Sequence, residues 1–163
     1  MSSIAVKDVE ATNSLIWFRN DLRINDHPGI NSALSISRKV IGFYCFNSSM
    51  FKITNLGFPK IDKFRAKFLL ETIENLKEDL KKINVTLIIK IGDPVEELTK
   101  IISQQKIKNI FFQKEWTQEE VDEEDQLKSK CNDINFKSYY SQFLYDPDDL
   151  DINNVPDIFT SFR

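Results

Sequence analysis

Five short apolar segments alternate with longer amphipathic segments along this chain. The apolar segments are rich in aromatic and β-branched residues, which is typical of buried strands. They cover residues 14–18, 39–46, 85–92, 109–113 and 134–140. Helical spacing of apolar residues predicts helices over residues 27–38, 62–83, 93–106 and 117–131.

Residues that favour helix starts precede several of these helical segments. Asp62 and Asp93 can cap the second and third helices, and Pro94 stands at a first helical position. Thr117 and Glu120 have the spacing of a capping box at the start of the fourth helix. Ile30, Leu34 and Ser37 recur at helical spacing on the first helix. The apolar stripe predicted for the second helix consists of Phe64, Phe68, Leu69, Ile73, Leu76, Leu80 and Ile83.

This alternation predicts an α/β fold, a doubly wound five-stranded parallel sheet with helices on both faces. Such sheets bind ligands beyond the carboxyl ends of the strands, where the strand order reverses. If the first strand lies centrally beside the fourth, a crevice is expected between residues 19–21 and residues 114–116. Residues 1–13 are polar and mixed in charge, and we expect them to form a loose leader.

Composition and charge narrow the functional classes. With 163 residues, of which 41% are hydrophobic, the chain can bury the core of one domain. A net charge of -3 gives no overall attraction to nucleic acid. Cys45, Cys131 and the single histidine, His27, lack metal-ligand spacing and favour a cytoplasmic protein with reduced cysteines. No apolar run reaches membrane-spanning length, and no signal-peptide pattern is present.

The charged stretch after the first predicted strand lacks the glycine-rich loop that cradles phosphate. A Rossmann dinucleotide fingerprint and a P-loop are therefore absent. We interpret Asp21, Arg23 and Asp26 as local ion pairs that pin this loop. Arg19 and Asn20 lie nearest the strand end, and a ligand-binding role and a structural role are equally open for them.

Several segments, taken in order, resemble DNA photolyases and cryptochromes. They read LIWFRNDLRINDHPGI, GFPKIDKFRAKFLLETIENLKEDL, IIKIGDPVEEL, QKEWTQEEVDEE and LYDPDDL, with VPDIFTSFR at the end. The Gly-Phe-Pro-Lys turn and the last segment are similar to DASH-type cryptochromes, and the resemblance covers residues 14–163. The chain departs from the family pattern at His27 and Gly29, where Asn and Ala are common, and at Ile61-Asp62, where Thr-Gly is frequent.

The resemblance implies an α/β domain over residues 14–141 and, over 142–163, the start of a linker toward a helical FAD-binding domain absent from this chain. The complete flavoprotein would be a carbon–carbon lyase that uses light to repair cyclobutane pyrimidine dimers in damaged DNA. The α/β domain would bind an antenna chromophore, usually methenyltetrahydrofolate and sometimes a deazaflavin. Because the absent domain completes the folate cage, binding by this piece should be weak. The piece itself carries no catalytic residue.

In the DASH-like pattern, the Glu immediately before a Val binds the pterin. The resemblance therefore implies that Glu120, which precedes Val121, is the pterin-binding carboxylate. A carboxylate can accept hydrogen bonds from both donors on a pterin edge. The alternative role of Glu120 is capping with Thr117. Glu115 is the second candidate, and its alternative is an ion pair with Lys114 or Arg19.

Two aromatic residues complete the candidate site. Trp116 is expected either to stack on the pterin or to pack in the core, and Phe51 is expected to form an apolar wall. The acidic run over residues 119–125 is interpreted as a solvated helix face that does not meet DNA phosphates.

Two other functional classes remain open on the same fold. One is a stand-alone nucleotide-binding module, although no glycine-rich turn supports it. The other is a protein-interaction module that self-associates through an apolar surface near the C-terminus. The residues expected on that surface are Phe143, Leu144, Ile158, Phe159 and Phe162.

Overall fold

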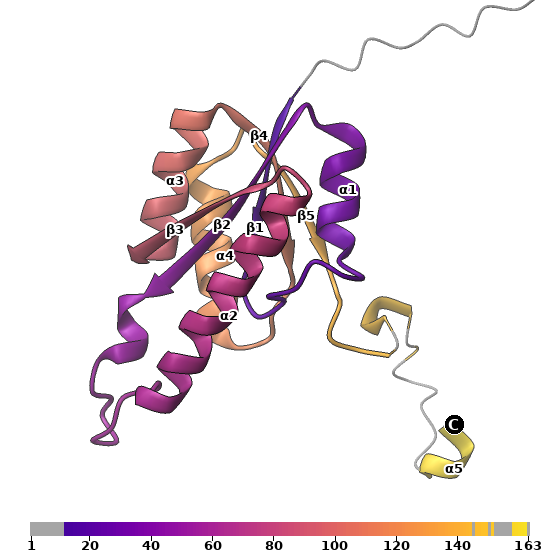
Figure 1. The fold of residues 1–163 in the computed structure, drawn as a ribbon. Coiled ribbons are helices and arrows are strands. Elements are labelled where there is room, and N and C mark those ends of the chain that lie inside the picture. Colours follow the sequence, from indigo (N-terminus) through magenta and orange to yellow (C-terminus); the bar gives the residue numbers. More distant parts are fainter. Residues whose placement is uncertain (1–11, 145, 150, 152–157, 163) are drawn as a thin grey trace, which may run out of the picture.

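A five-stranded parallel sheet forms the centre of the molecule, with β1 in the middle and β4 beside it (Figure 1). The computed structural model describes residues 12–144, 146–149, 151 and 158–162. The strand order is β3-β2-β1-β4-β5, and every pair is parallel, as the sequence predicts. The strands are β1 (Asn13–Trp17), β2 (Lys39–Asn47), β3 (Thr86–Gly92), β4 (Ile107–Gln113) and β5 (Asn135–Tyr139).

Helices cover both faces of this sheet. The long helices are α1 (Pro28–Ile36), α2 (Lys63–Lys82), α3 (Pro94–Gln105) and α4 (Gln118–Lys130). The short ones are η1 (Ser48–Phe51), η2 (Pro147–Asp149) and α5 (Phe159–Phe162). Helices α1 and α2 pack on one face, and α3 and α4 pack on the other. The predicted doubly wound fold is confirmed.

Adjacent residues of the central strand supply the two halves of the core, because side chains alternate across a strand. Leu15 points into the layer that contains Leu98 of α3, and Ile16 points into the layer that contains Leu80 of α2. All four side chains are fully buried. Burying each one contributes about 2 kcal/mol before the entropy of ordering is subtracted. Covering both faces explains why the strands read as continuous apolar runs.

The starts of α2 and α3 follow the predicted signals, and α1 has a cap that was not predicted. Asp93 caps α3 by accepting a hydrogen bond from the main-chain N–H of Glu96 at 2.9 Å, and Pro94 occupies the first helical position. The cap of α1 is His27, whose Nδ1 accepts from the main-chain N–H of Ile30 at 3.1 Å. The sequence analysis assigned no such role to His27.

The predicted apolar stripe of α2 is correct only along its C-terminal half. Ile73, Leu76 and Leu80 are buried, whereas Phe64 is 77% exposed and Phe68 is 68% exposed. The N-terminal half of α2 extends past the ends of the strands, next to the loop that carries η1 (Figure 1). The sheet therefore cannot cover the first two turns of the helix.

The predicted stripe of α1 is also shifted. Ile30 and Ala33 are buried against the sheet, whereas Leu34 is exposed. The helix turns about 100° per residue, so Leu34 lies to one side of the face that Ala33 presents to the strands. The small side chain of Ala33 allows α1 to pack closely on the sheet.

The predicted ends of the domain fall partly outside the described residues. Residues 1–11 of the expected leader lie there, and β1 begins at Asn13. Positions 145, 150, 152–157 and 163 of the expected linker lie there as well. The domain boundaries therefore stay predictions.

The different environments of the two halves of α2 can be tested by two substitutions. Leu80→Ala is expected to lower the free energy of unfolding by about 3 kcal/mol, because the side chain is fully buried and its removal leaves a cavity. Phe64→Ala is expected to change it by less than about 0.5 kcal/mol, because the ring lies on the surface. Urea denaturation of both variants provides the measurement. Similar losses in the two would contradict this placement of α2.

Candidate functional site

A crevice of about 280 Å³ opens at the carboxyl edge of the sheet. The ends of β1 and β2 form its floor, and its walls come from η1, α2 and the first turns of α4. The predicted position beyond β1 is therefore correct. On the other side the wall comes from the start of α4, whereas residues 114–116 do not line it. The polar residues that line it include Arg19, Asn20, Glu120 and Glu123.

Arg19 enters this crevice directly from the end of β1. Its side chain is 6% exposed, and its guanidinium carbon lies 4.6 Å from the centre of the Trp17 ring. Nη2 donates to the main-chain oxygen of Glu120 at 2.9 Å and lies 3.7 Å from Glu123 Oε2. Among the described residues, Arg19 Nη1 is the one buried side-chain nitrogen or oxygen without a hydrogen-bond partner. Leaving such a donor unpaired costs roughly 1–3 kcal/mol, and a ligand acceptor would relieve this cost.

Asn20 brings together the loops that follow β1 and β4. Its Nδ2 donates to Glu115 Oε1 at 2.9 Å and lies 3.4 Å from Glu120 Oε1. Glu115 Oε1 also accepts from Gln113 Nε2 at 3.0 Å. The predicted ion pair of Glu115 with Lys114 or Arg19 is therefore wrong, because two amide groups occupy this carboxylate. The predicted proximity of Asn20, Glu115 and Glu120 is confirmed.

Glu120 lies at the crevice in the first turn of α4, although the predicted capping box does not form. The Thr117 side chain accepts no hydrogen bond from the helix. Instead, its hydroxyl donates to Glu120 Oε2 at 2.7 Å. Thr117 thus orients the carboxylate from one side while Asn20 contacts the other oxygen. The ligand-binding role of Glu120 stays a prediction.

Glu123, which was not among the predicted site residues, lies one helical turn after Glu120 and also lines the crevice. It accepts a hydrogen bond from Asn47 Nδ2 at 2.7 Å. Burial raises the pKa of the Glu123 carboxyl, an effect that the Arg19 charge and the Asn47 hydrogen bond only partly oppose. Glu123 is half-buried, and Glu124 is buried and pairs with Lys128 at 2.6 Å. The solvated face predicted for residues 119–125 is therefore wrong at these two positions, and the spacing of Glu123 from Glu120 was the available signal.

Neither predicted aromatic residue lines the crevice. Trp116 is 56% exposed and stacks on Tyr140, with ring centres 5.5 Å apart, and Phe143 lies against its edge. Trp116 is thus not a core residue. Phe51 is exposed at the end of η1, and Phe68 of α2 supplies apolar surface to the crevice instead.

The local ion pairs predicted after β1 do not form. Asp21 is buried and accepts hydrogen bonds from His27 Nε2 at 3.1 Å and from the Tyr139 hydroxyl at 2.8 Å. Arg23 donates to the main-chain oxygen of Asp26 at 3.2 Å. Because Tyr139 belongs to β5, the local sequence around Asp21 could not reveal this partner.

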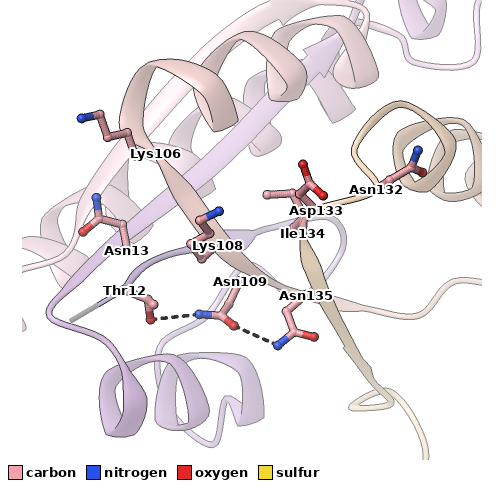
Figure 2. A pocket seen from close by; sticks show the side chains of 9 residues that line it. All are labelled: Thr12, Asn13, Lys106, Lys108, Asn109, Asn132, Asp133, Ile134 and Asn135. Atoms are coloured by element: carbon pink, nitrogen blue, oxygen red, sulfur yellow. Dashed lines mark hydrogen bonds between the residues drawn. The ribbon is translucent and has the colours of Figure 1, made fainter. Parts of the chain in front are cut away.

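A second, wider hollow of about 900 Å³ lies at the opposite, amino edge of the sheet (Figure 2). Its polar side chains include Lys106, Lys108 and the buried Asn109. The Asn109 amide donates to Thr12 at 3.2 Å and accepts from Asn135 at 3.4 Å. Because these partners already satisfy the buried amide, nothing in this hollow corresponds to the unpaired donor of Arg19. The crevice at the carboxyl edge is the stronger candidate.

A sequence model described as DNA photolyase matches residues 14–163. The chain belongs to the DNA photolyase family. It is similar to the cryptochrome DASH of Synechocystis, with 37% identity over 153 residues, covering 91% of this chain and 31% of that protein. The cryptochrome DASH of Gloeobacter violaceus is 35% identical over the same length and with the same coverage. This DNA photolyase-family chain thus spans about a third of the length of these relatives.

Solved structures give a consistent result for the fold. The Synechocystis cryptochrome crystal structure superposes with a TM-score of 0.85 and 35% identity, covering 93% of this chain and 32% of that one. An archaeal photolyase from Sulfolobus tokodaii gives a TM-score of 0.75 and 25% identity, with 93% and 33% covered. The sheet of this photolyase-family chain is therefore that of the photolyase N-terminal domain.

Metal sites, cysteine pairs and membrane-spanning helices were also sought in the described part of this photolyase-family chain. No group of three or more His, Cys, Asp or Glu residues there is arranged to hold a metal ion. Both cysteines, Cys45 and Cys131, are buried and free. None of the described helices has the length and apolar character needed to cross a membrane.

The raised pKa of Glu123 predicts a specific pH dependence. The folded chain retains this proton above the ordinary value of 4.5, so wild-type stability should fall as pH rises between the unfolded and folded pKa values. Gln cannot titrate, so the stability of Glu123→Gln relative to wild type should rise as the pH increases above the ordinary value of 4.5. Urea denaturation across this range measures the difference. A difference that does not change with pH would contradict the prediction.

Proposed function

We propose that this chain is the antenna-binding α/β domain of a DASH-type cryptochrome or a related photolyase. The crevice at the carboxyl edge would hold a reduced folate, methenyltetrahydrofolate. The observation that carries this proposal is an oriented carboxylate, Glu120, beside a buried guanidinium, Arg19, whose Nη1 has no partner. Membership of the family supports it, as does the position of the crevice beyond the carboxyl ends of β1 and β2, beside the strand-order reversal between β1 and β4.

The polar groups present fit a pterin. A pterin edge presents neighbouring N–H and NH₂ donors, which one carboxylate can accept together with charge-assisted strength. Glu120 would take these donors, while Glu115, which lies outside the crevice lining, would hold Asn20 beside Glu120. Arg19 Nη1 would donate to a carbonyl oxygen of the ring. When bound, the folate would absorb near-ultraviolet or blue light, while these residues hold and orient it.

We further propose that the remaining activity belongs to a longer flavoprotein. A helical domain joined through residues 142–163 would bind FAD and damaged DNA and would perform light-driven repair of cyclobutane pyrimidine dimers. The net charge of -3 and the acidic start of α4 do not favour contact of this domain with DNA phosphates. Self-association through the C-terminal apolar surface stays a prediction. Phe143, Leu144 and Ile158 of that surface are exposed.

A second occupant is a flavin. The Sulfolobus tokodaii photolyase is described as containing two FAD molecules, with the implication of a novel light-harvesting cofactor. A flavin ring presents an N–H flanked by carbonyl oxygens, which also suits a carboxylate beside an arginine. A stand-alone nucleotide-binding module has less support, since no glycine-rich loop follows β1.

The folate proposal can be tested with two variants, each of which replaces the glutamate at the third position of a helix with alanine. Glu120 is the third residue of α4, and Glu96 is the third residue of α3, at the same edge of the sheet but outside the crevice. Glu120→Ala is expected to weaken binding of methenyltetrahydrofolate by about tenfold or more, because charge-assisted hydrogen bonds are lost. Glu96→Ala should bind like wild type. Fluorescence titration of the purified chain measures both affinities.

The outcomes distinguish an error in the identity of the ligand from an error in the assignment of Glu120 to its site. Equal weakening by Glu96→Ala and Glu120→Ala, or none by either, would remove Glu120 from the site. Saturable binding of FAD that Glu120→Ala weakens, without folate binding by wild type, would favour the flavin. Absence of binding of either chromophore to wild type would contradict the antenna proposal for this chain.

A further inference from the structure

A buried carboxylate lies beneath the loop that carries Arg19 and Asn20, outside the lining of the crevice. Asp21 is 2% exposed. Its Oδ1 accepts from the main-chain N–H of Arg19 at 3.1 Å. Its Oδ2 accepts from the Tyr139 hydroxyl at 2.8 Å and from His27 Nε2 at 3.1 Å. A carboxylate buried to this extent depends on such donors, so its orientation is fixed by them.

The hydrogen bonds of His27 determine which ring nitrogen carries the hydrogen. Nδ1 accepts from the main-chain N–H of Ile30, so the hydrogen must be on Nε2, where it is donated to Asp21. One imidazole therefore caps α1 and orients Asp21. Burial alone would raise the pKa of Asp21, but the hydrogen bond from His27, helped by Arg19 N–H and Tyr139, holds it below its ordinary value.

Tyr139 connects this cluster to the loop on the other side of the crevice. It is the last residue of β5, and its main-chain oxygen accepts from the main-chain N–H of Lys114 at 2.9 Å. Lys114 immediately precedes Glu115, the partner of Asn20. Burial, reinforced by the negative charge of Asp21, raises the pKa of the Tyr139 hydroxyl, which therefore stays a donor.

The phenol of Tyr139 fits against α1 because residue 29 is glycine. A Cβ atom at Gly29 would lie 2.6 Å from both the hydroxyl oxygen and a ring carbon of Tyr139. This spacing is too short for any real side chain. Gly29 and His27 thus both lie against the same tyrosine.

We propose that Asp21, His27 and Tyr139 form a positioning unit for the crevice. Asp21 fixes the main chain at Arg19 by accepting its N–H. Tyr139 links Asp21 to the loop before Glu115, because its hydroxyl donates to Asp21 and its main-chain oxygen accepts from Lys114. The groups that bind the antenna are thereby held in place before it arrives. The benefit to folate affinity rests on the proposed function, whereas the effect on the Arg19 main chain needs no ligand.

The other charged groups near this unit are Arg23 and, around a hollow beside Tyr139, Lys114, Asp146 and Asp148. Arg23, from the same loop, lowers the pKa of Tyr139 only as the smallest of its influences. Its guanidinium donates to the main-chain oxygens of Asp26 and Ser141. Helix α1, which packs above the unit, contains no charged residue. The titration of Asp21 therefore reports chiefly on His27 and Tyr139.

Two substitutions and a matched control test the unit. Tyr139→Phe removes one hydroxyl, and His27→Asn keeps a good capping residue while removing the imidazole. Ser14→Ala is the control, because it deletes a buried, hydrogen-bonded hydroxyl at the other end of β1. The readouts are hydrogen exchange of the Arg19 amide, the NMR titration of the Asp21 carboxyl carbon, and affinity for methenyltetrahydrofolate.

Both unit variants are expected to lower the protection of the Arg19 amide by about fivefold, the equivalent of one hydrogen bond. The Asp21 titration should move to higher pH in both, because a donor to the carboxylate is lost. Folate affinity should fall by about fivefold. Ser14→Ala should leave the Asp21 titration and the folate affinity unchanged. If the unit acted only through the general stability of the fold, Ser14→Ala would change them as well.

Unchanged Arg19 protection and Asp21 titration in the unit variants, or equal changes in Ser14→Ala, would overturn the inference. If wild type binds no folate while these two readouts respond as expected, the positioning unit stands and the proposed ligand is wrong. Should Tyr139→Phe fail to fold, His27→Asn supplies the same readouts.

Discussion

Parallel pairing of β1 with both β2 and β4 is the constraint on which the rest of this structure depends. Since all five strands run the same way, their carboxyl ends meet at one edge of the sheet. Helices bury both faces, so polar side chains can gather only where the strands end. The charged stretch that follows the apolar end of β1 is placed there by this geometry, with Arg19 and Asn20 beside the start of α4.

Much of the fold could be predicted from the sequence because the decisive signals are local. Short apolar runs, helical spacing and the Asp93-Pro94 helix start each depend on neighbouring residues. Knowledge of the parallel topology then sufficed to expect Asn20 and Glu115 near each other, whereas Glu120 came from the family resemblance. Features that depend on distant partners were missed. The hydrogen bond of Asp21 to Tyr139 joins residues 118 positions apart, and the exposure of Phe64 depends on where the sheet ends.

The missed residue Glu123 shows how a surface pattern can mislead. An acidic run at a helix start is usually solvated, and the helix dipole favours it there. In this chain α4 begins at the crevice, so one side of the same run faces a buried arginine. Glu123 is only loosely paired with Arg19, and Arg19 Nη1 is unpaired. Such unsatisfied polar groups are costly in a scaffold and more often tolerated where a ligand completes them.

An antenna domain makes a different demand on its protein than an enzyme does. Under the proposed function no bond is made or broken here, so what the residues must supply is a fixed place and orientation for a chromophore. A rigid crevice meets that demand, since groups held in advance lose less entropy when the ligand binds. The hydrogen bonds among Asp21, His27 and Tyr139 provide such rigidity from behind the crevice. Buried positioning residues, rather than a nucleophile or an acid–base pair, are therefore the chemistry that this fold should be expected to contain.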